Sequence, residues 1–471
     1  MATIFNEQRV LGVRIVADGT TMYNGLPVIG LYDAGAVLFG NNLRTLSVSV
    51  ISTADAMYND QPVRGAVVIS DGRKLYNGML VLPATGLDPF SMFTVDIDYV
   101  AGTAKGGTQP YGNNTNDGRL FRDPSNVVAC FLPDAAGVYQ SLGAAGIRRT
   151  TKGAYNYPSA TVRNLWGGDL TNAAWVKTNM TAAKDQPGID GAANAASSLL
   201  ATAANATALQ TIVLASSTQL YQVCIKRLIG TGPILMTIDG TNFTDITAQI
   251  TGGANYAIAF MTLAAVTNPV IGFKIATSGD KIAVDCNMTF APPVATQLVP
   301  REDLVRTAGA TILNSQSRPS ADIADAAPNT LINIARGPFA FYHECTSLRP
   351  TGGFLITGAT GIFISVDATQ AGAVKFNANA GQSITVAGKW KSDGVGINRV
   401  AGFFTADGRI KVACNGALGN LDTDATVEAA LDHFDQSTNG AGTNSLYSWT
   451  RRFCMGANLE FSDAQLLAMA A

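Results

Sequence analysis

The chain has 471 residues, of which 14% are charged, and its formal net charge is −2. This length accommodates about three domains of ~150 residues. The near-neutral charge argues against a nucleic-acid partner. The longest apolar run, residues 257–266, is too short to span a bilayer, so we expect no membrane insertion.

Turn dipeptides dominate the sequence. Asp-Gly occurs seven times and Asn-Gly four times, and both tolerate the positive φ of two-residue hairpin turns. They predict an all-β chain, with an N-terminal module of short β-repeats followed by two β-sandwich (jelly-roll) domains. The six cysteines form no CxxC pair, so we expect small buried hydrophobes rather than disulfides or metal ligands. With only two histidines, a histidine-based metal site or catalytic triad is not expected.

The first 100 residues contain an internal repeat. Met-Tyr-Asn-Gly at 22–25 recurs as Met-Tyr-Asn-Asp at 57–60 and Leu-Tyr-Asn-Gly at 75–78, with a degenerate copy at 38–41. The aromatic positions of the four copies are Tyr23, Phe39, Tyr58 and Tyr76. One such unit is too small to bury its own apolar side. Residues 1–100 therefore form either a self-contained β-domain or, as we favour, an attachment module that becomes ordered on a larger assembly.

Residues 101–158 are rich in glycine and asparagine and predict a linker with short strands. Arg148, Arg149 and Lys152 form its basic cluster, which we expect to be a solvated loop.

Apolar residues recur at every second position further along the chain, at 221–226, 234–238, 271–275 and 281–290. Period two indicates strands with one buried and one wet face. Such strands need a second sheet to cover their apolar faces. We therefore predict a β-sandwich over residues 159–293.

The runs at 164–166, 172–177, 185–194 and 238–245 occur in an order that resembles the carbohydrate-binding-like jelly rolls of tailed-bacteriophage fibre and spike proteins. The resemblance implies a module that binds glycan or spaces other parts. Trp175 would then stack on a sugar ring, although a single Trp at the start of a sandwich is commonly core. Asp239 and Asn242 are further glycan candidates. With Asp245 they also have a calcium-like spacing, although Asp-Gly-Thr-Asn is first of all a hairpin turn.

A proline-punctuated linker at 294–334 precedes the last module, residues 335–471. This module ends in a strand at 449–453 and a short helix that a Ser462–Gln465 capping box begins. The ending resembles the closing segment of concanavalin-type lectin sandwiches in phage proteins, and implies a lectin-like β-sandwich. It lacks a clear sugar or calcium motif. Trp390 and Arg399 are its glycan candidates, with a packing Trp in a surface loop as the alternative.

These resemblances imply a virion protein of a tailed phage: a tail fibre, a spike or a head-decoration protein. The repeats would anchor it to capsid, portal or tail proteins during assembly in the host cytoplasm. Its sandwiches, as a homotrimer, would adsorb to host-surface glycan. The alternatives are a structural decoration or adaptor without a ligand and, less favoured, a polysaccharide-degrading tailspike.

A glycanase needs two paired carboxylates. Glu344, Asp367 and Glu460 are available, but nothing in the sequence pairs them, so we expect no catalytic residues and no enzyme.

Overall fold

The computed structural model describes the strands β1–β12 within residues 1–88, and residues 89–105, 129–134, 138–143, 148–251, 253–292, 298–314, 320–322, 334, 337–350, 352–358, 363–379, 382–423, 425, 433–436 and 446–471. Strands dominate these residues, which confirms the all-β class. Within them, no helix is both long enough and apolar enough to cross a membrane. All six cysteines are buried and unbridged, as the sequence predicts.

The jelly roll is a sandwich of two five-stranded antiparallel sheets, one ordered β20-β23-β28-β25-β26 and the other β21-β22-β29-β24-β27. The four segments with this period of two are its strands β24, β25, β28 and β29. Alternate residues such as Tyr221, Phe273 and Val284 are buried together between the sheets. The bounds are β20 Val176–Thr178, β21 Met180–Gln186, β22 Ala196–Ala201, β23 Ala206–Thr211, β24 Ser217–Ile229, β25 Ile234–Thr237, β26 Thr244–Asp245, η2 Thr247–Gln249, β27 Ala257–Val266, β28 Val270–Ile275 and β29 Lys281–Phe290.

The outer face of the second sheet is also apolar and is covered by a third layer. Two short strand pairs, β15 (Cys130–Pro133) with β16 (Tyr139–Leu142) and β19 (Ala160–Val162) with β30 (Ile312–Asn314), contribute to it. Their side chains share one buried cluster with Cys224, Met288 and Phe290 of β24 and β29. One jelly-roll sheet is therefore buried on both faces, whereas the outer face of the other sheet carries exposed and half-buried residues.

β27 is the last strand of the second sheet, and no described strand pairs with its outer edge, which Gln249 protects. The Gln249 amide donates to the Phe260 carbonyl oxygen at 3.2 Å and accepts from the Phe260 N–H at 2.9 Å, as a neighbouring strand would. The ten residues of β27 include no charge and no proline, and such edges pair with other chains when bare.

Replacing Gln249 with alanine should therefore increase self-association relative to the wild type, because β27 loses the side chain that covers its edge at Phe260. Sedimentation velocity across a concentration series measures this. Gln186→Ala, on edge strand β21 beside Lys184 and Asp185, is the matched control and should sediment as the wild type. Identical sedimentation of Gln249→Ala and the wild type would contradict the protective role.

The C-terminal sandwich pairs a nine-stranded sheet with a six-stranded one around a separate core, which includes Phe341, Phe376 and Phe453. The strands of the first sheet are β13 Val95–Asp98, β14 Thr103–Lys105, β17 Arg149–Thr150, β18 Gly153–Asn156, β32 Phe339–Ser347, β37 Ile397–Phe404, β38 Ile410–Cys414, β39 Ala417–Leu418 and β41 Ser448–Ala457. The second has β31 Ser320–Asp322, β33 Phe354–Gly358, β34 Phe363–Val366, β35 Val374–Asn379, β36 Gln382–Val386 and β40 His433–Gln436. The 3-10 helix η1 (Pro89–Met92) and helix α2 (Asp463–Met469) contribute to an apolar cluster with residues of β32, β37 and β38. The predicted Ser462–Gln465 capping box is present at the start of α2.

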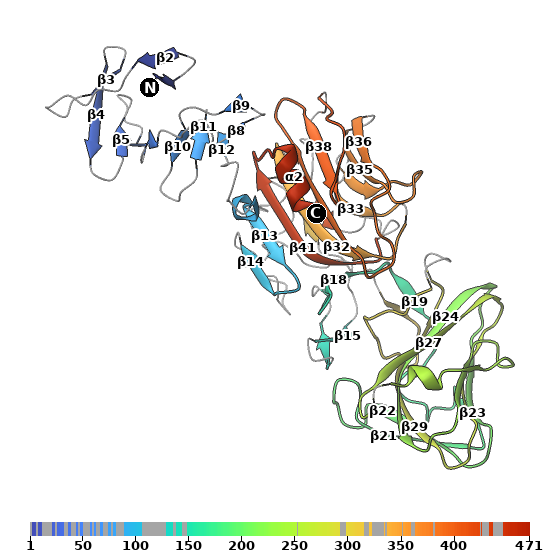
Figure 1. Cartoon of the computed structure of the whole chain (residues 1–471). Coiled ribbons are helices and arrows are strands. Elements are labelled where there is room, and N and C mark those ends of the chain that lie inside the picture. The colour runs from blue at the N-terminus through green and yellow to red at the C-terminus, as the bar shows by residue number, and fades with distance from the viewer. Residues whose placement is uncertain are drawn as a thin grey trace.

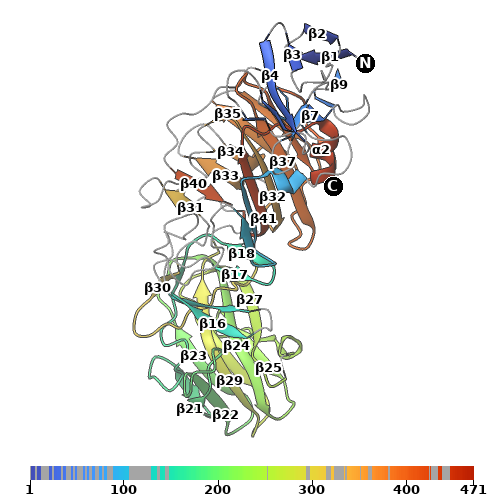
Figure 2. The ribbon, with the colours of Figure 1, turned by 90° about the vertical axis from the view of Figure 1, so that its left-hand side faces the viewer.

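The jelly roll is inserted into the chain of this sandwich. Both β13 and β18 pair with β41, although they precede the jelly roll in sequence and β41 follows it. In both views the C-terminal sandwich lies between the jelly roll and the N-terminal strands (Figure 1, Figure 2). Strands from the predicted attachment module and from the predicted 101–158 linker thus complete the C-terminal sheet.

The N-terminal strands form hairpins. Their bounds are β1 Ala2–Phe5, β2 Gln8–Leu11, β3 Thr21–Tyr23, β4 Leu26–Tyr32, β5 Ala36–Leu38, β6 Arg44–Thr45, β7 Val48–Ser49, β8 Met57–Tyr58, β9 Gln61–Pro62, β10 Ala66–Val68, β11 Lys74–Tyr76 and β12 Met79–Val81. Tyr23 pairs with Leu26, Tyr58 with Gln61, and Tyr76 with Met79. Three copies of the repeat thus pair in the same register. The side chains of these tyrosines, and Phe39 as a whole, lie outside the described residues.

Candidate functional site

The two tryptophans named as glycan candidates are both in the protein interior. Trp175 is 1% exposed and donates from Nε1 to the Trp166 carbonyl oxygen at 3.2 Å. Trp390 is 7% exposed and donates to the Arg349 carbonyl oxygen at 2.9 Å. Burying a large ring and satisfying its N–H locally is the usual role of a core Trp. Neither ring face is therefore accessible to a ligand.

Asp239 and Asn242 form a closed turn between β25 and β26. Asp239 accepts from the Thr241 N–H at 2.9 Å, the Asn242 N–H at 2.8 Å and the Asn242 side chain at 2.6 Å. Burial acts to raise the pKa of Asp239, but these hydrogen bonds outweigh it and hold the pKa well below its usual range. Asp245 accepts from the Thr247 N–H at 2.8 Å. No cluster of three or more His, Cys, Asp or Glu suited to a metal occurs among the described residues.

Arg399 lies on the outer face of the nine-stranded sheet and is committed to neighbours. Its Nε lies 3.1 Å from Glu344 Oε2, and its Nη1 donates to the Ala471 carbonyl oxygen at 2.7 Å. Arg451 and Tyr342 bind the same Glu344 carboxylate at 2.9 and 2.8 Å. The Arg399 side chain is 37% exposed, but its polar atoms are bound to these neighbours.

A different surface combines accessible polar groups, namely the outer face of the first jelly-roll sheet. Its strand registers place one residue of each strand side by side across the whole sheet. We call this the polar row, and in order from β20 to β26 it contains Thr178, Thr207, Lys274, Leu235 and Asp245. The two end residues are exposed and the other three half-buried. Five strands about 4.8 Å apart make the row about 19 Å long, which suits an extended ligand rather than a single ring.

An aromatic side chain lies beside the polar row. The Lys274 Nζ lies 4.3 Å from the centroid of the half-buried Phe243 ring, within cation–π range. Phe243 belongs to the loop that the Asp239 turn opens, so the predicted hairpin positions this aromatic residue instead of binding a ligand itself. Phe243 and Lys274 could not be recognised as a pair from the sequence, because their contact depends on the β25–β28 register. The one feature of the sequence that could have indicated this contact is Phe243, an aromatic residue shortly after the Asp239–Gly240 turn.

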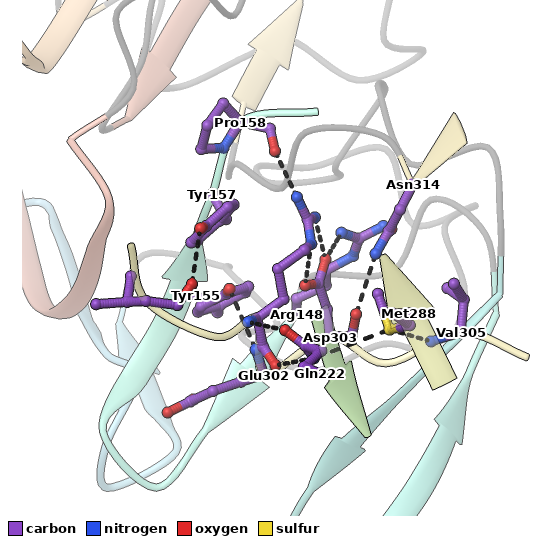
Figure 3. Close-up of polar contacts among 12 residues, drawn as sticks. Arg148, Tyr155, Tyr157, Pro158, Gln222, Met288, Glu302, Asp303, Val305 and Asn314 are labelled. Atoms are coloured by element: carbon purple, nitrogen blue, oxygen red, sulfur yellow. Dashed lines mark hydrogen bonds and ion pairs between the residues drawn. The ribbon is translucent and has the colours of Figure 1, made fainter. Parts of the chain in front are cut away.

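The second polar cluster lies where the two sandwiches join (Figure 3). Arg148 and Arg301 share the carboxylate of Asp303, and all three side chains are 0% exposed. Arg301 binds Asp303 through Nη2 at 2.6 Å and Nε at 2.8 Å, and donates to the Pro158 carbonyl oxygen at 2.7 Å. Burial lowers the pKa of Arg301, but Asp303 outweighs burial and leaves the pKa above its ordinary value. The expected solvated loop at Arg148 is wrong, because its guanidinium is buried and pairs with the carboxylate of Asp303. Arg148 precedes the jelly roll in the sequence and Asp303 follows it.

Aromatic rings surround this ion cluster. The Arg301 guanidinium lies 4.5 Å from the ring centroid of Tyr157, which stacks on Tyr155 at 5.6 Å. Tyr157 also contacts Tyr447 at 4.9 Å, edge to face. Burial raises the pKa of Tyr157 to about 12. Gln222 of β24 exchanges two hydrogen bonds with the Arg301 backbone, at 2.7 and 3.0 Å. The junction therefore joins the jelly roll to the C-terminal sandwich through buried contacts.

Comparison with known proteins finds no matching family model and no matching curated protein. Solved structures with similar folds include the Ruminococcus gnavus IT-sialidase CBM40 bound to α2,6-sialyllactose, at 13% identity and a TM-score of 0.27, covering 32% of this chain and 92% of that one. Another is the binding domain of botulinum neurotoxin DC in complex with rat synaptotagmin II, at 13% identity and a TM-score of 0.25, covering 33% and 40%. These likenesses concern the fold of about a third of the chain.

Proposed function

We propose that this chain is a non-enzymatic display protein of a phage virion, a fibre, spike or head decoration that adsorbs to host-surface glycan. The N-terminal hairpins anchor it to other virion proteins, and three copies associate. The polar row carries this proposal, because it is the surface where hydroxyl, ammonium and aromatic groups lie together and accessible. Sugars bind through such hydrogen-bonding groups beside an apolar ring face. The ion cluster at the junction supports display, because it fixes the orientation of the jelly roll on the C-terminal sandwich.

The carboxylates considered for a glycanase support a non-catalytic role. A glycosidase acid needs a raised pKa. Burial acts to raise the pKa of Glu344, but its hydrogen bonds from Tyr342, Arg451 and Arg399 lower it overall. The hydrogen bond from Thr369 lowers the pKa of Asp367. Glu460 binds Arg409 through both carboxylate oxygens. Unchanged viscosity of host polysaccharide on incubation with the protein is the expected result, and a fall in viscosity would overturn this part.

Phe243→Ala and Lys274→Ala test the polar row. Each should weaken binding to a host-glycan array about fivefold, since an aromatic contact or a cation–π partner contributes about 1 kcal/mol. Val395→Ala, which trims an 81%-exposed side chain on the other sandwich, is the control and should bind as the wild type. Wild-type binding by both variants would remove the polar row as the site. An array that the wild-type protein does not bind would favour the alternative, a structural decoration without ligand.

A further inference from the structure

Lys177, the middle residue of β20, directs its ammonium back into the loop before the strand. Three consecutive backbone carbonyl oxygens meet it there. Nζ donates to the oxygens of Leu170 at 3.0 Å, Thr171 at 3.1 Å and Asn172 at 3.0 Å. An ammonium carries three N–H donors, so each donor has one carbonyl. The arrangement is that of a small cation coordinated by carbonyl oxygens.

The loop is folded by hydrogen bonds that do not involve Lys177. The Leu170 N–H donates to Ser197 Oγ at 2.9 Å, and the Thr171 N–H donates to Asp169 Oδ1 at 3.2 Å. The Trp175 N–H donates to the Asn172 carbonyl oxygen at 3.1 Å. These bonds orient the carbonyl groups whether or not an ammonium lies among them. The three oxygens should therefore remain a preformed site after the lysine is removed.

The environment selects for a cation of low charge. Burial lowers the pKa of Lys177, and the charge of Asp169 only partly offsets this, so the ammonium has exchanged water for carbonyl oxygens. Asp169 is itself bound to Thr171 and Lys184. Calcium takes about six to eight oxygen ligands and favours several carboxylates. Neutral carbonyl oxygens instead suit potassium-sized monovalent cations.

We propose that residues 170–172 form a monovalent-cation site whose cation, in this chain, is the tethered ammonium of Lys177. The site holds β20 to the body of the jelly roll. Lys177 on β20 binds the Leu170 carbonyl oxygen, and the Leu170 N–H binds Ser197 of β22. Lys177 is thus a positioning residue for the end of the polar row. The tethered cation also makes the loop independent of dissolved metal, so chelators leave the wild type unchanged.

Lys177→Ala empties the site, whereas Lys177→Met fills it with an uncharged stem of similar length. Thermal unfolding of the full chain should show a Tm about 4 °C below the wild type for Lys177→Ala. Ammonium or potassium chloride at about 0.5 M should recover most of that loss, since a ligand that binds only the folded state raises Tm. Tetramethylammonium chloride at the same ionic strength should not. Lys177→Met should lose stability without recovery in any salt.

Thallium(I), which mimics potassium, gives a direct readout. Crystals of Lys177→Ala soaked in thallium(I) should show an anomalous peak among the three carbonyl oxygens, and Lys177→Met crystals should not. Equal Tm responses of both variants to the three salts, or the absence of that peak, would overturn the proposal. If Lys177→Ala does not fold in buffer alone, its refolding yield in ammonium against tetramethylammonium gives the same comparison. None of these measurements depends on glycan binding.

Discussion

Replacing Asp303 with asparagine should lower the free energy of unfolding by about 3–5 kcal/mol, the largest loss we expect from a single side chain. Asparagine keeps the size and shape of the side chain but removes its charge. The guanidinium groups of Arg148 and Arg301 would then remain at 0% exposure without the carboxylate they share. An uncompensated buried charge costs far more than the loss of a surface ion pair. Urea unfolding measures the difference.

Glu302→Gln is the matched control, one residue away. Glu302 binds Lys152 at 2.6 Å, but the Lys152 side chain is 55% exposed. Exposed pairs contribute about 1 kcal/mol or less, and glutamine still accepts the hydrogen bond that Trp449 donates to Glu302 at 3.0 Å. We therefore expect a small loss from Glu302→Gln that shrinks further in high salt. The loss from Asp303→Asn should persist in high salt, because buried charges are poorly screened.

The position of Asp303 adds a second readout. Its arginine partners connect the chain on entry to and exit from the jelly roll, so Asp303→Asn should also uncouple the two sandwiches. Calorimetry should then resolve separate unfolding transitions for the jelly roll and the C-terminal sandwich, and these transitions should lie closer together in the wild type. Stability equal to that of Glu302→Gln, with an unchanged calorimetric profile, would show that the cluster does not hold the junction.

Local patterns were sufficient to predict the strands but not their partners. The alternation at 221–226 and 281–290 predicts β24 and β29, because the pleat turns successive side chains to opposite faces. The expected wet face of these strands is wrong, because the third layer also buries Gln222 and Cys224 on the other face of β24. The capping box at Ser462 likewise depends on four neighbouring residues. The pairing of β13 with β41 joins residues more than 350 positions apart, as Asp98 with Arg452 shows. No periodicity within either strand carries that information, so the insertion of the jelly roll could not be predicted.

The candidate site shows the same division. Trp175 and Trp390 were selected by residue type, but type does not distinguish a binding ring from a core ring. Whether a ring binds ligand or packs in the core depends on its burial. The burial of each ring depends in turn on the sheets that pack over it in its own sandwich. Phe243 is only half-buried, and it follows a turn whose Asp239 accepts hydrogen bonds from its own loop. Lys274 reaches Phe243 only through the β25–β28 register. Residue identity thus predicted the turn, whereas the polar row required the order of strands in the sheet.

Acidification should destabilise the C-terminal sandwich through His343, before the carboxylates titrate. His343 lies on β32 with 0% exposure, its Nε2 is 3.3 Å from Thr450 Oγ1, and its Nδ1 has no hydrogen-bond partner within the described structure. Burial lowers its pKa from 6.5 to about 3, with Glu344 acting weakly in the opposite direction. The folded state therefore holds this imidazole neutral at pH values where the unfolded chain takes up a proton.

The sign of the effect follows from proton linkage. Between the two pKa values the unfolded state binds more protons, so stability is complete above the unfolded pKa and is lost as pH falls toward the folded one. Between about pH 8 and about pH 5 the loss should be about 2 kcal/mol. Urea unfolding at intervals across this range measures it. His343→Gln should abolish this slope whatever its own stability, because glutamine does not titrate. His433→Gln, at the other histidine, should retain it, and a wild-type slope in His343→Gln would show that the proton binds elsewhere.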